Sequence, residues 1–388
     1  MKTILLIFLF AYSISFAQII NGTVVDDTEH RLSNVSIYLD GTKTGTVSKE
    51  DGTFTLSVPQ TSGTIVFQKE DYETFSTEVS AVINKKLKVV LTKTNAIEEI
   101  KLIPYTSEAY TNYIHLFLRN FIGDDQENVR IKNQKTLKFS YDKQNKLLRV
   151  KAPKTLIIEN KQLGYEIEYN LLSYSTDFNA NITHYTGTSF FKETRNTDKI
   201  KINRMNAYDG SLLHFFRSIY NNTISENGFI VNQVVKVSNP NYPTEEELNT
   251  LKDFMFMTRT SKVINIPEDI RAISQRKTSQ KPYTLAITKT LIPDSHYVRR
   301  TNGQVFFSFK DILQVNYIKT AYEHLKGNQL IKGKSKINTS SFLYSEEGQS
   351  FEVSKEGNIT TPDQLITQGD FSKNKIENML PLDYQPGN

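Results

Sequence analysis

The chain contains neither cysteine nor tryptophan in its 388 residues. Without cysteine it forms no disulfide or thiolate metal site, and it has no cysteine that could carry a lipid after removal of a leader. The folded state must therefore rely on the size of its hydrophobic core in place of disulfides, and the length suffices for two ordinary domains. The composition excludes a cysteine-anchored lipoprotein and thiol catalysis.

Catalytic motifs are also missing. None of the six histidines begins a His-x-x-Glu pair, and HExxH, GxSxG, P-loop and GxGxxG motifs are absent. A Ser-His-Asp triad is defined by geometry rather than by spacing, so the sequence leaves that arrangement open. Asp40 and Asp51 are explained as turn residues rather than calcium ligands, since no dense acidic loop surrounds them. We therefore predict no enzyme, no cofactor and no metal.

Only one long apolar run is present, from Ile4 to Phe16, after the positive start Met1-Lys2. Small residues at Ser15 and Ala17 precede Gln18, a pattern typical of a cleaved secretory signal peptide at residues 1–17. No later stretch approaches the roughly 18 apolar residues of a spanning helix. We predict an exported protein, periplasmic or associated with the outer membrane, not a lipoprotein, with no transmembrane span in the mature chain.

Basic residues only slightly outnumber acidic residues in the chain. The chain has 47 basic and 42 acidic residues, and loss of Lys2 lowers the net charge from +5 to +4. A nucleic-acid binder would show a concentrated basic stripe, so nucleic acid is not an expected partner. Residues 132–161 are nevertheless rich in lysine, which favours either a solubilising strand face or contact with acidic glycans or lipopolysaccharide phosphates. An envelope protein or glycan is the expected partner, and the oligomeric state stays open.

Residues 18–94 show the two-residue alternation of short strands. Val35, Ile37 and Leu39 alternate with polar residues, and Asp51-Gly52 lies between two further alternating segments, as in a hairpin. About seven short strands with turns every 8–12 residues predict a β-sandwich.

The same segment resembles a known family. The resemblance is carried by Ile20-Asn21-Gly22-Thr23-Val24-Val25-Asp26, Leu32-Ser33-Asn34-Val35-Ser36-Ile37, Gly45-Thr46-Val47-Ser48 and Asp51-Gly52-Thr53-Phe54. These residues resemble the carboxypeptidase-regulatory-like domain, a transthyretin-like, immunoglobulin-like sandwich found in exported Bacteroidetes proteins. The resemblance implies no catalysis, because this domain accompanies carboxypeptidases without being their catalytic part.

Residues 95–105 form the predicted linker, and residues 106–388 a larger, β-rich α+β region. Helices are predicted over 106–122, over 208–220, after Pro243 and over 373–380, and a hairpin is predicted to join 342–344 to 351–353. Several short segments of this region, including Gly210 to Arg217 and Leu380 to Tyr384, resemble segments of uncharacterised exported Bacteroidetes proteins that carry the same sandwich. That resemblance supplies no active-site residues.

The expected fold class is thus mainly β with some α. An acidic stretch at 97–100 is similar to one in TonB-dependent receptors, but the remaining length lacks their series of barrel strands.

Three places in the second region carry candidate polar residues. On the helix at 208–220, His214 and Arg217 share one face with Ser218, opposite an apolar stripe. These side chains either line a groove, or they face solvent or a neighbouring domain. On a predicted strand, Glu166 and Glu168 point to one side, as an acid/base pair or as solvated carboxylates. A third pair, His115 and Arg119 on the helix at 106–122, is either an anion-binding site or part of a solvated polar face.

Two functional hypotheses follow. The first is a non-enzymatic cell-envelope protein with a docking sandwich and a binding or scaffolding body, whose ligand surface lies between the two regions. The alternative is a hydrolase of envelope glycans or peptides with an unrecognised active site. A deep pocket where titratable groups converge would favour the hydrolase.

Overall fold

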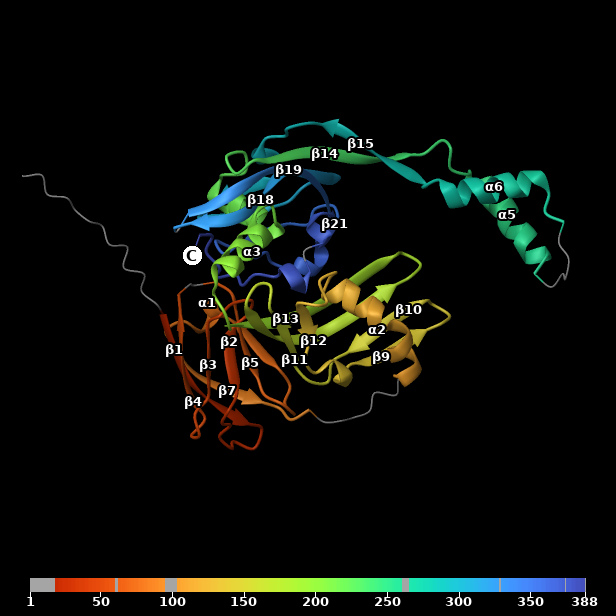
Figure 1. Cartoon of the computed structure of the whole chain (residues 1–388). Coiled ribbons are helices and arrows are strands. Elements are labelled where there is room, and N and C mark those ends of the chain that lie inside the picture. The colour runs from red at the N-terminus through yellow and green to blue at the C-terminus, as the bar shows by residue number, and fades with distance from the viewer. Residues whose placement is uncertain are drawn as a thin grey trace, which may run out of the picture.

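The structure is a computed structural model that describes residues 18–59, 62–94, 103–259, 265–327, 329–373 and 375–387. It is mainly β with some α: small N-terminal sheets are followed by a larger mixed α+β region (Figure 1). The predicted signal peptide and most of the predicted linker lie outside the described residues. No helix within the described ranges is long and apolar enough to cross a membrane.

The N-terminal part, which we call the sandwich, consists of two sheets over one core. One sheet has the order β4-β1-β7 and the other β3-β2-β5-β6, and apolar side chains from both fill the space between them. β4 shows why the sequence alternates, since Phe54, Leu56 and Val58 are buried while their neighbours are not. The elements are β1 (Gln18–Asp26), β2 (Ser36–Leu39), β3 (Gly45–Val47), β4 (Thr53–Val58), β5 (Thr64–Gln68), β6 (Phe75–Glu78), α1 (Val79–Val82) and β7 (Lys86–Leu91).

The next part, the middle sheet, has the order β8-β11-β12-β10-β9, with β13 paired to β12. Its core is rich in rings, and α2 lies against it through Tyr110 and Phe117, both of which contact Phe139 edge-on. The elements are α2 (Ser107–Phe121), β8 (Val129–Ile131), η1 (Gln134–Thr136), β9 (Lys138–Asp142), β10 (Leu147–Lys151), β11 (Leu156–Asn160), β12 (Tyr165–Asp177) and β13 (Ile182–Glu193).

The third part, the C-terminal sheet, has the order β15-β14-β18-β19-β21 and encloses a second core with α4 and the small sheet β16-β17-β20. Its elements are α3 (Asp198–Tyr208), α4 (Leu212–Asn221), β14 (Phe229–Ser238), β15 (Tyr283–Lys289), η2 (Asp294–His296), β16 (Val298–Thr301), β17 (Gln304–Phe307), β18 (Ile312–Lys326), β19 (Gln329–Tyr344), β20 (Phe351–Val353), η3 (Pro362–Gln364), β21 (Ile366–Gly369) and η4 (Phe371–Lys373).

Two helices between β14 and β15 stand apart from all three cores. α5 (Glu245–Met257) and α6 (Glu268–Ser279) lie at the outer end of the β14–β15 ribbon, well away from the body (Figure 1). We call them the arm. The helix predicted after Pro243 is α5, and it begins with a capping box, the pattern that Thr244 and Glu247 favour in the sequence: Thr244 caps α5, and Glu247 accepts a bond from the Thr244 backbone.

Residues 376–384 include η5 (Ile376–Asn378) and connect all three parts, so we call this segment the strap. Ile376, Leu380 and Tyr384 enter the core of the middle sheet, and Leu382 N donates to Gly41 O of the sandwich at 2.7 Å. Gly123 ends α2 with φ 122°, and a Cβ there would lie 2.2 Å from the Glu377 carboxyl carbon. Only glycine allows both the turn and the approach of the strap.

The sandwich packs directly on β13. Tyr38 and Phe190 stack with ring centroids 5.3 Å apart, and Thr42 forms an isolated bridge with Phe190. The Tyr38 hydroxyl lies 3.0 Å from Thr188 Oγ1, and Ser189 N donates to Asp40 Oδ1 at 2.7 Å. We call this contact the seam.

Some predicted elements differ from the structure. β20 pairs with β17 instead of forming a hairpin with the end of β19, which pairs with β18 and β21. The final predicted helix is two 3-10 turns, η4 and η5. Helices α3 and α6 were not predicted, because neither carries a clear apolar stripe: α3 buries Arg204 beside Ile200 and Ala207.

Candidate functional site

A hollow of about 690 Å³ is lined by residues of α2 and the middle sheet on one side and of the β21–η4 segment on the other. We call it the cationic cleft. Its walls come from α2, from the β12–β13 turn and from the β21–η4 segment. The lining residues are Leu116, Arg119, Asn120, Thr176, Phe178, Asn181, Ile182, Thr183, His184, Tyr185, Leu212, Leu365, Ile366, Thr367, Gln368, Gly369, Phe371, Ser372 and Lys375.

The basic groups of this cleft come from three distant parts of the sequence. Arg119 lies in the last turn of α2, His184 lies on β13 and Lys375 precedes the strap. Lys375 Nζ donates to Arg119 O at 2.8 Å, which holds the two cations on one wall. The Arg119 guanidinium and the His184 ring have no hydrogen-bond partner among the described residues. No carboxylate occurs among the described lining residues, so the cleft carries positive charge.

The neutral polar groups of the cleft form a short hydrogen-bonded row. Asn120 Nδ2 donates to Thr183 Oγ1 at 3.1 Å, and Thr183 Oγ1 lies 2.9 Å from Thr176 Oγ1. Asn181 and Gln368 add two further amides. Because amides and hydroxyls both donate and accept, this row suits a ligand that is rich in hydroxyl groups.

Two rings give the cleft apolar surface. Phe178 is 37% exposed and leans on Tyr113 and Tyr141 at centroid distances of 5.8 and 5.7 Å. Tyr185 packs edge-on against Phe121 at 5.1 Å, and burial raises the pKa of its hydroxyl to about 12. Tyr185 therefore stays neutral at physiological pH, and the cleft combines ring surface, cations and hydroxyl-binding groups.

The predicted residue His214 lies elsewhere, in the core of the C-terminal sheet. It is 9% exposed, its Nδ1 accepts from Gly210 N at 3.2 Å, and its ring centroid is 4.7 Å from that of Tyr208. Burial lowers the pKa of His214 to about 4, so the ring is neutral at pH 7. His214 lines none of the hollows described here, and its role is packing.

Arg217 is buried beside it and binds backbone carbonyls. Its Nε donates to Glu356 O at 3.0 Å and its Nη2 to Leu382 O of the strap at 2.9 Å. The guanidinium is thus satisfied by the protein and joins α4 to the strap, which agrees with the interdomain interpretation of this helix face.

Glu166 and Glu168 lie on one face of β12, as predicted, but each is paired with a lysine. Glu166 Oε2 is 2.6 Å from Lys132 Nζ, and Glu168 pairs with Lys192. Both pairs are partly exposed to solvent. The structure does not bring these acids together with His214 or Arg217, which lie on α4 in the other core.

Asp209 neighbours His214, and sequence reasoning missed it. Its Oδ1 accepts from the Tyr317 hydroxyl at 2.6 Å, while the buried Oδ2 has no hydrogen bond and lies 3.7 Å from Lys332 Nζ. The group is enclosed by protein and reaches none of the hollows described here.

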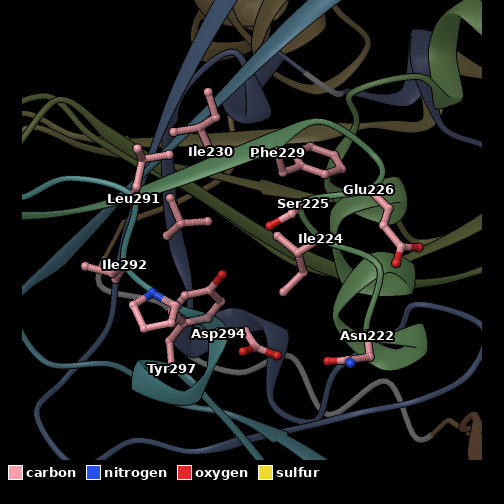
Figure 2. A pocket seen from close by; sticks show the side chains of 12 residues that line it. Asn222, Ile224, Ser225, Glu226, Phe229, Ile230, Leu291, Ile292, Asp294 and Tyr297 are labelled. Carbon is pink, nitrogen blue, oxygen red and sulfur yellow. The ribbon is translucent and has the colours of Figure 1, made fainter.

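Two other hollows have a different character. One of about 630 Å³ lies between the sandwich and the C-terminal sheet and contains Asp40, Glu78, Glu352 and Glu356. Hydroxyl or amide groups of the protein already bond Glu78 and Glu352, at 2.9 and 3.0 Å. Another, of about 320 Å³, lies beside β14 and is walled by Ile224, Phe229 and Ile292; Figure 2 shows the carboxylates of Glu226 and Asp294 on separate elements around it.

Of the six residues in the three predicted polar pairs, Arg119 alone lines the cationic cleft. His115 is exposed outside it. His184 and Lys375 were missed because residues 119, 184 and 375 meet only through the fold, and no spacing in the sequence signals that meeting.

Comparison with known proteins identifies one part of the chain. Among solved structures, the chain is similar to a putative membrane-associated protein of unknown function from Bacteroides fragilis. The two chains are 9% identical, and the match covers 90% of this chain and 94% of the other. The TM-score is 0.16, so this likeness carries no argument about fold or role. No curated protein matches the chain. The CarboxypepD_reg-like domain model matches residues 20–102, and the resemblance expected from the strand residues is confirmed there. The chain thus carries a CarboxypepD_reg-like domain in front of a larger α+β region.

Proposed function

We propose that this protein is a non-enzymatic, exported cell-envelope protein that binds an acidic glycan in the cationic cleft. The sandwich serves as the docking module, and the two-core body presents the binding surface. The observation that carries the proposal is the cleft itself, in which Arg119, His184 and Lys375 face a hollow without a carboxylate among its described lining residues.

The chemistry of the cleft supports a charged saccharide over a small inorganic anion. Cations bind carboxylate, sulfate or phosphate substituents through charge-assisted hydrogen bonds. The row Asn120–Thr183–Thr176 offers groups for sugar hydroxyls. The Phe178 ring offers an apolar face of the kind that small-molecule sites use to exclude water.

The absence of paired acid/base groups in the cleft supports a binding role rather than hydrolysis. Retaining or inverting glycoside hydrolysis requires two carboxyl groups on either side of the scissile bond. The acids predicted for that role, Glu166 and Glu168, are instead held by Lys132 and Lys192. Among the described residues that line the cationic cleft, none forms the pair of carboxyl groups that the hydrolase alternative needs.

Export is supported by the residues that precede the sandwich. The apolar run from Ile4 and the small residues before Gln18 have the order of a secretory signal. We propose the periplasm or the outer-membrane surface as the location, with an envelope glycan or protein as partner, no nucleic acid, and no lipid anchor.

Binding is tested by calorimetric titration of the mature chain with oligogalacturonate, and with neutral galactose oligomers of the same length. We expect binding of the acidic oligomer alone, weakening with salt because the cations are exposed. Arg119→Gln and Lys375→Gln each remove one charge from the cleft wall. We expect each to weaken binding about five- to tenfold, the loss of one charge-assisted hydrogen bond.

Lys151→Gln is the matched control, because Lys151 is an exposed lysine on β10 outside the cleft. Equal loss of affinity in this control, or binding of the neutral oligomer as tight as that of the acidic one, contradicts the proposal. Release of reducing ends from either oligomer contradicts its non-enzymatic part.

A further inference from the structure

A hollow beside the start of β14 contains polar side chains that the protein itself leaves unpaired. It measures about 320 Å³, and Figure 2 shows the side chains that line it. Some of them come from the turn between α4 and β14, and others from the segment that runs from the end of β15 into η2. We call it the β14 hollow. Its volume lies at the lower end of the range of small-molecule sites, so it suits a short ligand.

Both walls of the β14 hollow are held in place by hydrogen bonds of the protein. In the α4–β14 turn, Asn227 Nδ2 donates to Ser218 Oγ at 2.8 Å. On the other side, Ile292 N donates to Val231 O of β14 at 2.9 Å. Because these bonds need no ligand, the walls are formed in the free protein, and a ligand does not have to order them.

Tyr297, which follows η2, directs a hydroxyl group without a partner into the β14 hollow. The residue is 3% exposed, and its hydroxyl has no hydrogen-bond partner among the described residues. Figure 2 shows this hydroxyl directed into the space between Ile292 and Ile224. Buried polar groups are nearly always hydrogen-bonded in folded proteins. The unpaired hydroxyl therefore indicates that the hollow takes up a ligand with a polar group at this end.

Among the described residues that line the β14 hollow, the charged ones are both acids. Glu226 lies in the α4–β14 turn, and Asp294 begins η2. The exposed Glu226 carboxylate has no hydrogen bond or ion pair among the described residues. Glu226 is also the one charged residue between Arg217 and Lys236 in the sequence. The turn therefore places a negative charge without a counter-ion at the rim of the hollow.

Basic residues on the adjacent elements neutralise the second acid only in part. Arg300 Nη1 lies 3.4 Å from Asp294 Oδ2, and Asp294 Oδ1 has no partner among the described residues. Three further bases of these elements do not line the hollow: Lys289, His296 and Arg299. The hollow thus keeps one free carboxylate at Glu226 and one free carboxylate oxygen at Asp294, which favours a cationic ligand.

Much of the remaining wall of the β14 hollow is apolar. Ile224, Phe229 and Ile292 are buried side chains that line it. Such a wall accommodates methylene groups, in the way that the stem of a lysine side chain lies along apolar surface while its ammonium group stays in polar surroundings. The lining combines acids on two separate segments with apolar surface, so a cation at each end of an aliphatic chain fits it.

We propose that the β14 hollow binds a short linear aliphatic diamine. One ammonium group pairs with Glu226, and the methylene chain lies along Ile224 and Ile292. The other ammonium group donates to Asp294 Oδ1 and to the Tyr297 hydroxyl, since an ammonium group supplies donors and both of these oxygens accept. This site is independent of the acidic glycan, because other residues, from α2, β13 and the β21–η4 segment, line the cationic cleft.

Calorimetric titration of the mature full-length chain with 1,5-diaminopentane tests the proposal, beside titrations with 1-aminopentane and 1,5-pentanediol. We expect one saturable site for the diamine. We expect at least about tenfold weaker binding of the monoamine, which lacks one charge-assisted interaction, and no detectable binding of the diol. Added salt is expected to weaken binding of the diamine, because Glu226 is exposed.

Two variants each remove one group that contacts the ligand. Glu226→Gln is expected to weaken binding of the diamine about tenfold and to abolish its advantage over the monoamine. Tyr297→Phe is expected to weaken binding about three- to tenfold, the loss of one hydrogen bond. It is expected to leave the melting temperature of the free protein unchanged, because the hydroxyl has no partner there.

Glu127→Gln is the matched control. Glu127 is exposed in the turn after α2, as Glu226 is in the turn after α4, and it lies outside the β14 hollow. Absence of a saturable site for the diamine, binding of the diol as tight as that of the diamine, or equal loss of affinity in Glu127→Gln overturns the proposal. A lower melting temperature of Tyr297→Phe with unchanged affinity for the diamine also overturns it, because the hydroxyl would then serve the fold and not the ligand.

Discussion

Two buried titratable groups respond to pH in opposite directions. Burial raises the pKa of Asp40 at the seam from 3.8 to about 6, and burial lowers that of His214 from 6.5 to about 4. Between these values the native Asp40 binds more protons than the unfolded chain, and the native His214 binds fewer. Asp40 therefore makes stability fall as pH rises from about 4 to about 6, and His214 makes it rise over nearly the same window.

Replacing Asp40 is expected to reveal this balance. Asp40→Asn keeps an oxygen that can accept from Ser189 N but removes the buried charge. We expect the variant to be more stable than the parent by about 1–3 kcal/mol at pH 8, and equally stable at about pH 2.5, where Asp40 is protonated in both states. Urea unfolding at the two pH values measures the difference.

Asp51→Asn serves as the control for this experiment. Hydrogen bonds from Thr53 lower the pKa of the exposed Asp51, so its removal is expected to give no gain at pH 8. A stability gain for Asp40→Asn that is the same at both pH values would show that the charge of Asp40 is not the cause.

The sequence could identify residue types but not their surroundings. His214 and Arg217 were placed correctly on one helix face, yet α4 is buried on nearly every side, because the strap covers the face that carries Arg217. The pairing of Glu166 and Glu168 with lysines depends on the neighbouring segments at Lys132 and β13, which a single strand pattern does not contain.

Among the elements, α4 organises the core of the C-terminal sheet. Phe215 is fully buried and contacts the rings of Phe229, Phe307 and Phe371, with centroids 5.2, 6.2 and 5.8 Å away. Truncation of such a side chain removes its burial and leaves a cavity.

We expect Phe215→Ala to lower the free energy of unfolding by about 3–5 kcal/mol, the usual cost of a buried Phe to Ala change. Tyr220→Ala on the same helix, where the side chain is only partly buried, is the control and is expected to cost clearly less. Chemical denaturation of both variants gives the comparison, and equal losses would argue against a central role for Phe215.

Elements with local signals were predicted well. Residues three or four positions apart specify both the apolar face of α2, with Phe117 and Phe121, and the capping box of α5.

The partner of β20 was predicted wrongly, because strand pairing across many residues depends on the whole core and not on a nearby turn. α3 was missed since Arg204 takes a position where a helix usually buries an apolar residue: its guanidinium binds the Leu163 and Arg195 carbonyls and Glu193.

At the scale of the whole molecule, the seam holds the sandwich on the body. Phe190 stacks on Tyr38, and a Cβ at Gly45 would lie 2.7 Å from the Phe190 ring, so the sandwich backbone approaches the ring closely. The seam also contains the Tyr38–Thr188 and Asp40–Ser189 hydrogen bonds.

Phe190→Ala is expected to loosen the sandwich without unfolding it, because the core of the sandwich does not include Phe190. We expect a larger radius of gyration in small-angle scattering, and two calorimetric transitions that are separated by several degrees more than in the parent. Leu172→Ala, an exposed apolar position on β12, is the control. A single unchanged transition together with an unchanged radius would mean that the sandwich is held by other contacts.

The strap has a consequence for the order in which the molecule assembles. Leu382 bonds the sandwich at Gly41, Arg217 bonds Leu382, and Tyr384 contacts Tyr208, so three regions meet on one short segment that lies far along the chain from the sandwich. The sandwich can form its own two sheets from nearby segments, but its final placement depends on contacts between residues that most of the described chain separates. Docking of the strap, rather than collapse of any one core, is the step that fixes the architecture.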